Sequence, residues 1–277
     1  MIMTKKLFLT MTVLAAAATM FVACGEKEDD YEPEVVDLGL PSGTLWAKTN
    51  LGAKKAWNYG DYFAWGETKP KTDYRWETYK YCDGTGTSLT KYCYNAICGK
   101  NGFTDIAESG VYTLVPADDA ATAVLGAGFS MPTEADWSEL RSQCFWLWTW
   151  NYEGHNVAGY MVFEAKTDNE KGIVEYDVPD NPALNITDPH IFLPAAGWRS
   201  GPDLVESTPV PSGAQGSPTG NYWTSSIQVY PLQIESGIEL GLWPDKSALV
   251  VVFPINYYIS SSCTRSAGCS VRPVKRP

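Results

Sequence analysis

The sequence predicts an α+β fold with short antiparallel sheets, about two helices and long loops. Short runs of β-prone residues are interrupted repeatedly by Gly, Pro and Asn. Helical periodicity occurs in two places only, and long stretches rich in Gly, Pro and Ser have no periodicity at all. Few helices set among many short strands are typical of the α+β class.

The first part of the folded region contains short strands followed by irregular chain. Strands are predicted at Val35–Leu40, Leu45–Thr49 and Asp61–Trp65, with breaks at residues 41–43 and 58–60. Residues 66–110 contain Gly, Thr, Tyr and three cysteines with little periodicity, so we expect this segment to be irregular.

Two helices are expected next. The first covers residues 116–125, with a proline near its start and Gly126 just past its end. The second begins at Thr133, whose side chain is expected to form a capping box with Asp136. Its apolar face is formed by Trp137, Leu140 and Cys144.

The rest of the chain is predicted to be strands and two long connections. Phe145–Trp150 alternates with period two, which places three tryptophans on one side of a strand. Further strands are predicted at Gly159–Ala165, His190–Ala195, Tyr222–Ser226, Ala248–Phe253 and Ser270–Val274. Residues 167–189 are interpreted as a polar insertion and residues 199–220 as a long loop.

Residues 1–23 have the features of a secretory signal peptide. Lys5 and Lys6 precede the apolar run Leu7–Ala23, which is short for a membrane-spanning helix of ~20 residues. Cys24 follows a small residue at the expected cut, and this pattern resembles a bacterial lipobox. We therefore predict that Cys24 becomes the lipidated first residue; ordinary secretion with an incidental cysteine is the alternative.

Residues 24–34 are predicted to be the lipidated cysteine and an acidic, unfolded tether. The run at residues 25–30 resembles the signal that sends lipoproteins of the Bacteroides group to the outer face of the outer membrane. A solvated tether is the simpler interpretation, and both can hold. We expect an outer-membrane, lipid-anchored protein that faces the cell exterior and contacts the membrane only through its acyl chains.

The charge of the chain excludes some classes of partner. Removal of residues 1–23 takes away two of 21 basic residues and none of 32 acidic ones, so the net charge changes from −11 to −13. Such a chain lacks the basic footprint that nucleic acids or anionic lipid surfaces require. Neutral glycans, cationic partners and proteins all stay open. Residues 35–277 are expected to form a single domain.

Six cysteines remain after the lipidated one: Cys82, Cys93, Cys98, Cys144, Cys263 and Cys269. An even number in an exported chain permits disulfides, and the connectivity is open except for one local pair. Cys263 and Cys269 are the predicted pair. A zinc site is disfavoured because the chain has two histidines and no cysteine pair with the two-residue spacing of a zinc knuckle.

Several motifs occur in a fixed order along the chain. They are residues 36–47 (VDLGLPSGTLWA), 59–68 (YGDYFAWGET), 118–121 (DDAA), 131–133 (MPT) with Trp137, 191–197 (IFLPAAG), 222–226 (YWTSS) and 270–274 (SVRPV). Together they resemble the Fibrobacter succinogenes major paralogous domain, a family abundant in surface lipoproteins of gut Bacteroidetes and distantly similar to the C-type lectin fold. The resemblance runs from about Val35 to Val274.

The resemblance implies a C-type-lectin-like domain with two helices, variable long loops, and N- and C-terminal strands lying side by side. It implies no enzymatic activity and no cofactor. Strand 222–226 has no carboxylate or amide to bind calcium, which needs about six to eight oxygen ligands. We therefore expect no metal and no calcium-dependent sugar binding.

Catalytic motifs are absent from the sequence. It has no Gly-x-Ser-x-Gly elbow, no phosphate-binding glycine loop and no His-Glu-x-x-His helix. Formylglycine-generating oxidases share a related fold and use two nearby cysteines, but Cys263 and Cys269 are separated by one residue more than in those enzymes. A carboxylate pair of glycosidase type stays open. A non-enzymatic chain is the prediction, and the oxidase is the enzymatic alternative.

Binding of a glycan or a protein through the loops is the leading hypothesis. Sugars are held by aromatic faces, with Asp, Asn and Arg side chains contacting hydroxyls. The candidate ligand-binding residues are Trp198, Arg199, Asp203, Tyr222, Trp243 and Asp245. In a lectin-like topology, segments 198–203 and 243–245 are expected to meet on the variable surface. A structural or adhesive envelope subunit is the alternative.

Overall fold

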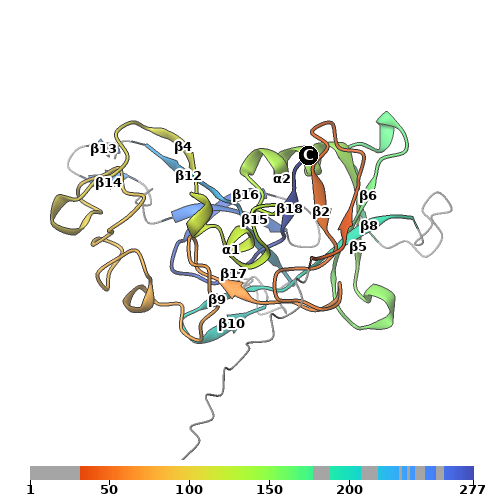
Figure 1. Cartoon of the computed structure of the whole chain (residues 1–277), viewed down its shortest axis with the longest axis horizontal. Coiled ribbons are helices and arrows are strands. Elements are labelled where there is room, and N and C mark those ends of the chain that lie inside the picture. The colour runs from red at the N-terminus through yellow and green to blue at the C-terminus, as the bar shows by residue number, and fades with distance from the viewer. Residues whose placement is uncertain are drawn as a thin grey trace, which may run out of the picture. The chain divides into compact units, whose positions relative to one another are not determined.

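The computed structural model describes residues 32–176, 188–206, 218–230, 233–235, 238–240, 247–253 and 259–277. Residues Glu32–Pro277 form one compact unit (Figure 1). The predicted signal peptide and Cys24 lie outside the described residues. Within the described ranges, no helix is long and apolar enough to cross a bilayer.

The α+β class is confirmed. The α-helices are α1 (Ala120–Leu125) and α2 (Glu134–Gln143). The strands are β1 (Val35–Val36), β2 (Leu45–Ala47), β3 (Tyr62–Phe63), β4 (Gly110–Thr113), β5 (Cys144–Thr149), β6 (Gly159–Glu164), β7 (Val174–Tyr176), β8 (His190–Pro194), β9 (Trp198–Ser200), β10 (Asp203–Val205), β11 (Gly220–Trp223), β12 (Ser226–Val229), β13 (Gln233–Glu235), β14 (Ile238–Leu240), β15 (Ser247–Phe253), β16 (Ile259–Thr264), β17 (Cys269–Ser270) and β18 (Val274–Lys275). In Figure 1 the β5–β6–β8 sheet lies on the right and the β4–β12 pair on the left, with both helices between them.

A four-stranded sheet, in the order β7-β5-β6-β8, carries the first part of the core. On β5, Trp146 and Trp148 are fully buried opposite Val162 and Tyr160 of β6. Helix α2 packs Trp137 into the same cluster, where its ring lies 4.7 Å from that of Trp46. Aromatic side chains that bury this much area make a large contribution to stability.

A five-stranded sheet, in the order β16-β15-β11-β17-β3, carries the second part of the core. Its central strand β11 pairs with β17 in parallel and with β15 antiparallel. The indole of Trp223 donates to the Phe63 carbonyl at 2.6 Å, and that of Trp65 donates to the Thr224 carbonyl at 3.0 Å. These bonds fix the orientation of the two indoles, since the buried N–H groups of both Trp223 and Trp65 have a partner.

The two ends of the domain meet in a three-stranded sheet, β1-β2-β18, as the family resemblance implies. Arg272, just before β18, is fully buried and fastens three segments together. It donates to the Ala47 carbonyl at 2.9 Å, to Asn50 Oδ1 at 2.9 Å and to the Phe192 carbonyl at 2.6 Å.

The capping box predicted for the second helix is confirmed, and the first helix is shorter than predicted. The Thr133 amide donates to Asp136 Oδ2 at 2.7 Å, and the Asp136 amide donates to Thr133 Oγ1 at 3.2 Å. The predicted helix 116–125 divides into a 3-10 turn over Pro116–Asp118 and then α1. The division occurs because Asp119 is an N-cap, accepting from the Thr122 amide at 2.8 Å.

Other boundaries also differ from prediction. The loop predicted at 199–220 begins with a hairpin of β9 and β10, and the insertion predicted at 167–189 contains β7. Trp150 lies just beyond β5 and is 54% exposed, so only two of the three tryptophans are in the core. The predicted tether also ends earlier, because Pro33 is buried and Glu32 and Glu34 pair with Lys275 and Lys48.

Candidate functional site

The predicted ligand-binding residues are only partly brought together. Trp198, Arg199 and Asp203 share the β9–β10 hairpin, where Asp203 lies opposite Ser200 and is exposed. Trp198, however, packs against the second core cluster. The guanidinium of Arg199 lies 5.1 Å from the centre of the Tyr62 ring, a cation–π contact inside the protein. Structural contacts therefore account for both larger side chains of the hairpin.

Tyr222 lies in the core and has no surface for a ligand. It is fully buried, and its hydroxyl donates to the Pro194 carbonyl at 2.9 Å and accepts from the Asn50 amide at 3.3 Å. Burial is the main cause of its raised pKa. Trp243 and Asp245 lie outside the described residues, so the predicted meeting of the two loop segments stays a prediction.

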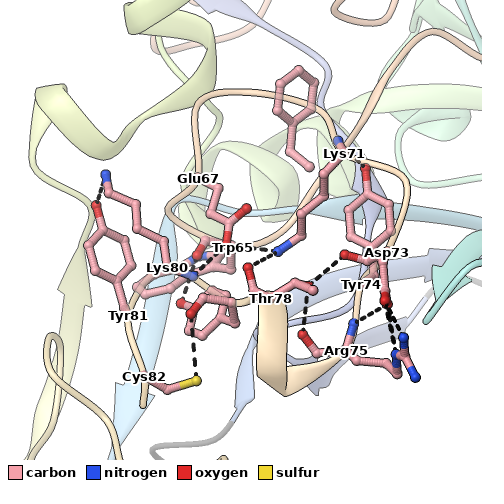
Figure 2. A network of polar contacts seen from close by, with 12 residues as sticks. Trp65, Glu67, Lys71, Asp73, Tyr74, Arg75, Thr78, Lys80, Tyr81 and Cys82 are labelled. Carbon is pink, nitrogen blue, oxygen red and sulfur yellow. Dashed lines mark hydrogen bonds and ion pairs between the residues drawn. The ribbon is translucent and has the colours of Figure 1, made fainter. Parts of the chain in front are cut away.

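A polar network organises the irregular segment after β3 (Figure 2). Glu67, which is buried, accepts from Lys71 Nζ at 2.9 Å and from the Lys80 amide at 2.7 Å. Lys71 Nζ also donates to the Thr78 carbonyl at 3.0 Å. The hydroxyl of Tyr79 donates to the Trp65 carbonyl at 2.8 Å. The network thus holds this loop around Lys71, and the polar groups named here are hydrogen-bonded within the loop itself.

Asp118 is the second anchor of this region. It is 4% exposed and accepts from the hydroxyl of Tyr92 at 2.8 Å, and also from the hydroxyl of Tyr81 and the ammonium of Lys91. Burial alone would raise the pKa of Asp118, but the hydrogen bonds from Lys91 and the two tyrosines outweigh it and lower the pKa. The carboxylate is fully engaged, so the cluster is interpreted as a structural clamp.

Six cysteines in the described ranges are free thiols. Cys263 is half-buried and Cys269 fully buried, and their side chains are hydrogen-bonded to each other. This bond lowers the pKa of Cys263, whereas burial raises that of Cys269. Contact between the two thiols is what a disulfide requires, and the disulfide itself stays a prediction. No group of three His, Cys, Asp or Glu side chains in the described residues is arranged to hold a metal ion.

A cavity of about 510 Å³ is lined by described residues other than the predicted ligand-binding ones. Its wall is formed by Glu34–Asp37 at β1, Lys48 after β2, Tyr152 and Glu153 in the turn after β5, and Asp188–His190 at the start of β8. Cavities of roughly 300–1,000 Å³ are typical of small-molecule sites. This cavity is the candidate functional site.

Aromatic packing and an unusual turn shape one wall of the cavity. The Tyr152 ring stacks on Phe192 of β8 with centroids 3.9 Å apart. The next residue, Glu153, has a φ of 48°, in the left-handed region that non-glycine residues rarely adopt. This turn precedes β6, and Glu153 forms part of the cavity wall.

His190 is hydrogen-bonded through both ring nitrogens in this wall. Its Nδ1 lies 2.9 Å from the Asp188 carbonyl, which can only accept, so Nδ1 carries the hydrogen. Nε2 lies 3.0 Å from the Tyr152 hydroxyl, which is also hydrogen-bonded to Glu153. Burial lowers the pKa of His190, which favours the neutral form.

The cavity was not predicted from the sequence, since its wall comes from segments far apart in the chain. The only local signal is the pair of acidic residues that flank β1; Glu34 falls in the predicted tether and Asp37 in the first predicted strand. No protein-family model, no curated protein and no solved structure matches the chain. The resemblance to a family therefore depends on the ordered sequence motifs alone.

Proposed function

We propose that the chain is a non-enzymatic, lipid-anchored protein of the outer membrane that faces the cell exterior and binds a glycan in the cavity. The observation that carries the proposal is the cavity itself, of about 510 Å³, with four carboxylates in its wall. Sugar hydroxyls are hydrogen-bond donors, and bonds to an ionised acceptor are stronger than those between neutral groups.

The location and the absence of catalysis rest on the sequence. The signal peptide, Cys24 and the acidic run after it support export and anchoring. The motifs that resemble the Fibrobacter succinogenes major paralogous domain support a lectin-like binding domain without a cofactor. Glu34, which directly follows the predicted anchor segment in the sequence, lies in the cavity wall.

A cavity-filling variant tests this function. Val35 lies in the wall and is half-buried, so Val35→Trp should occupy the cavity without changing its charge. Val111→Trp is the matched control, because Val111 is 60% exposed on β4 and outside the wall. The mature chain carrying Cys24→Ser would be screened on a glycan array with and without calcium.

Each outcome has a clear meaning. Saturable glycan binding that Val35→Trp abolishes and Val111→Trp preserves would support the proposal. Binding that both variants retain would exclude the cavity and direct attention to the β9–β10 hairpin. A blank array would refute glycan binding and favour the structural or adhesive alternative, which a pull-down from envelope extracts would then address.

A further inference from the structure

The cavity wall carries an excess of negative charge. Glu34, Asp37, Glu153 and Asp188 contribute four carboxylates, and Lys48 is the single cation in the wall. With His190 neutral, the formal charge of the wall is −3. The remainder of the chain does not offset it, because the whole sequence has a net charge of −11. Fields of one sign in a concave site concentrate counter-ions there.

Two of these carboxylates have no cationic partner among the described residues. Glu34 pairs with Lys48 at 3.0 Å, and Asp188 pairs with Lys166 at 2.5 Å. Among the described residues, Asp37 accepts from the Gly39 amide at 2.9 Å, and Glu153 is hydrogen-bonded to the neutral Tyr152 hydroxyl without an ion pair. The negative charges of Asp37 and Glu153 are therefore the ones that a bound ligand would neutralise.

The neutral polar groups of the wall leave few donors for a ligand. Both ring nitrogens of His190 are occupied, one by the Asp188 carbonyl and the other by the Tyr152 hydroxyl. The Tyr152 hydroxyl is itself hydrogen-bonded to both His190 and Glu153. Acceptors thus exceed donors, and a fitting ligand has to bring both hydrogen-bond donors and positive charge.

We infer that the cavity selects glycans that carry free, protonated amino groups, and disfavours neutral and anionic ones. An ammonium supplies the charge and up to three donors that the carboxylates of the wall lack. Sulfated or uronic-acid glycans would bring a like charge against Asp37 and Glu153. This inference rests on the proposed function, because it names the class of glycan that the same cavity takes.

Two matched probes test the selectivity. The trimer of glucosamine and the trimer of N-acetylglucosamine have the same rings and linkages, and differ in whether the amine is free or acetylated. Calorimetry at a pH where the amine is protonated should give about tenfold tighter binding of the free amine. The difference should shrink as salt rises from low to physiological concentration, because exposed charges are screened within ~8–10 Å.

Removal of a carboxylate from the wall and removal of its lysine should change the affinity for the glucosamine trimer in opposite directions. Asp37→Asn and Glu153→Gln should each weaken binding of the glucosamine trimer by about two- to fivefold. Lys48→Gln should strengthen it by a similar factor, since it removes the competing cation. Glu77→Gln is the matched control, because Glu77 is an exposed carboxylate outside the wall, and it should have no effect.

The outcomes separate this inference from the proposed function. If neither trimer binds and the array is blank, the glycan-binding function itself is refuted. If both trimers bind with equal affinity, or Lys48→Gln weakens binding of the free amine, the selectivity is refuted while the cavity remains a glycan site. In that second case, loss of binding of both trimers in Val35→Trp would keep the cavity as the glycan site.

Discussion

Arg272 offers a direct test of how the two ends of the domain are joined. Its guanidinium is fully buried, and its three hydrogen bonds reach Ala47, Asn50 and Phe192. Arg272→Met keeps an apolar stem of similar length and removes all three donors. The substitution should lower the free energy of unfolding without changing the fold.

The magnitude follows from the acceptors that lose their donor. A buried polar group left without a partner costs about 1–3 kcal/mol, so three of them would cost about 3–9 kcal/mol. Part of this is offset, because burial of a charge is itself unfavourable and lowers the pKa of Arg272. We therefore expect Arg272→Met to lower the free energy of unfolding by about 3 kcal/mol, the lower limit of this range. The total free energy of unfolding of a domain is about 5–15 kcal/mol.

Urea unfolding of the Cys24→Ser chain, followed by tryptophan fluorescence, measures this effect. With a slope of about 3 kcal/mol per molar urea, the midpoint should fall by about 1 M. Arg75→Met is the control, since the Arg75 side chain is 64% exposed and its ion pair with Asp73 contributes little. Equal midpoints for the two variants would show that Arg272 does not hold the segments together.

Three further predictions concern titration, oxidation and anchoring. Because burial lowers the pKa of His190 below 6.5, the unfolded chain binds a proton that the folded chain excludes, and stability should fall as pH drops below about 6.5; a His190→Gln variant with the same pH slope would contradict this. Peptide mass spectrometry of protein purified without reductant should find Cys263 joined to Cys269, and full alkylation of both thiols would argue against it. Cys24→Ser should leave the membrane fraction, and complete retention there would refute lipidation.

Local sequence signals predicted the elements that local interactions form. The capping box of Thr133 and Asp136 joins side chains and backbone within one helical turn, so its spacing is visible in the sequence. The alternation that predicted the strand after it also reflects a short-range rule. The class of the fold followed from such signals, because it needs only the kinds of elements and their order.

Pairing between strands that are far apart in the chain could not be predicted from the sequence. Strand β7 is three residues long and pairs in parallel with β5, some 28 positions earlier at Trp146 and Val174. Neither its length nor its composition distinguishes it from a loop. The same limit applies to Tyr222 and Trp150, where alternation cannot say which aromatic side chain faces the core and which faces solvent.

The number of aromatic residues turns out to say little about ligand binding. Six of the ten tryptophans in the described ranges are fully buried: Trp46, Trp65, Trp137, Trp146, Trp148 and Trp223. A tryptophan-rich sequence therefore indicates a heavily aromatic core before it indicates a sugar platform. Because Tyr152 is also buried, the cavity presents no open aromatic face from that residue. Discrimination between ligands then falls to the charged groups of the wall, and for this reason amine-bearing and acetylated glycans are the pair of probes that separates the hypotheses.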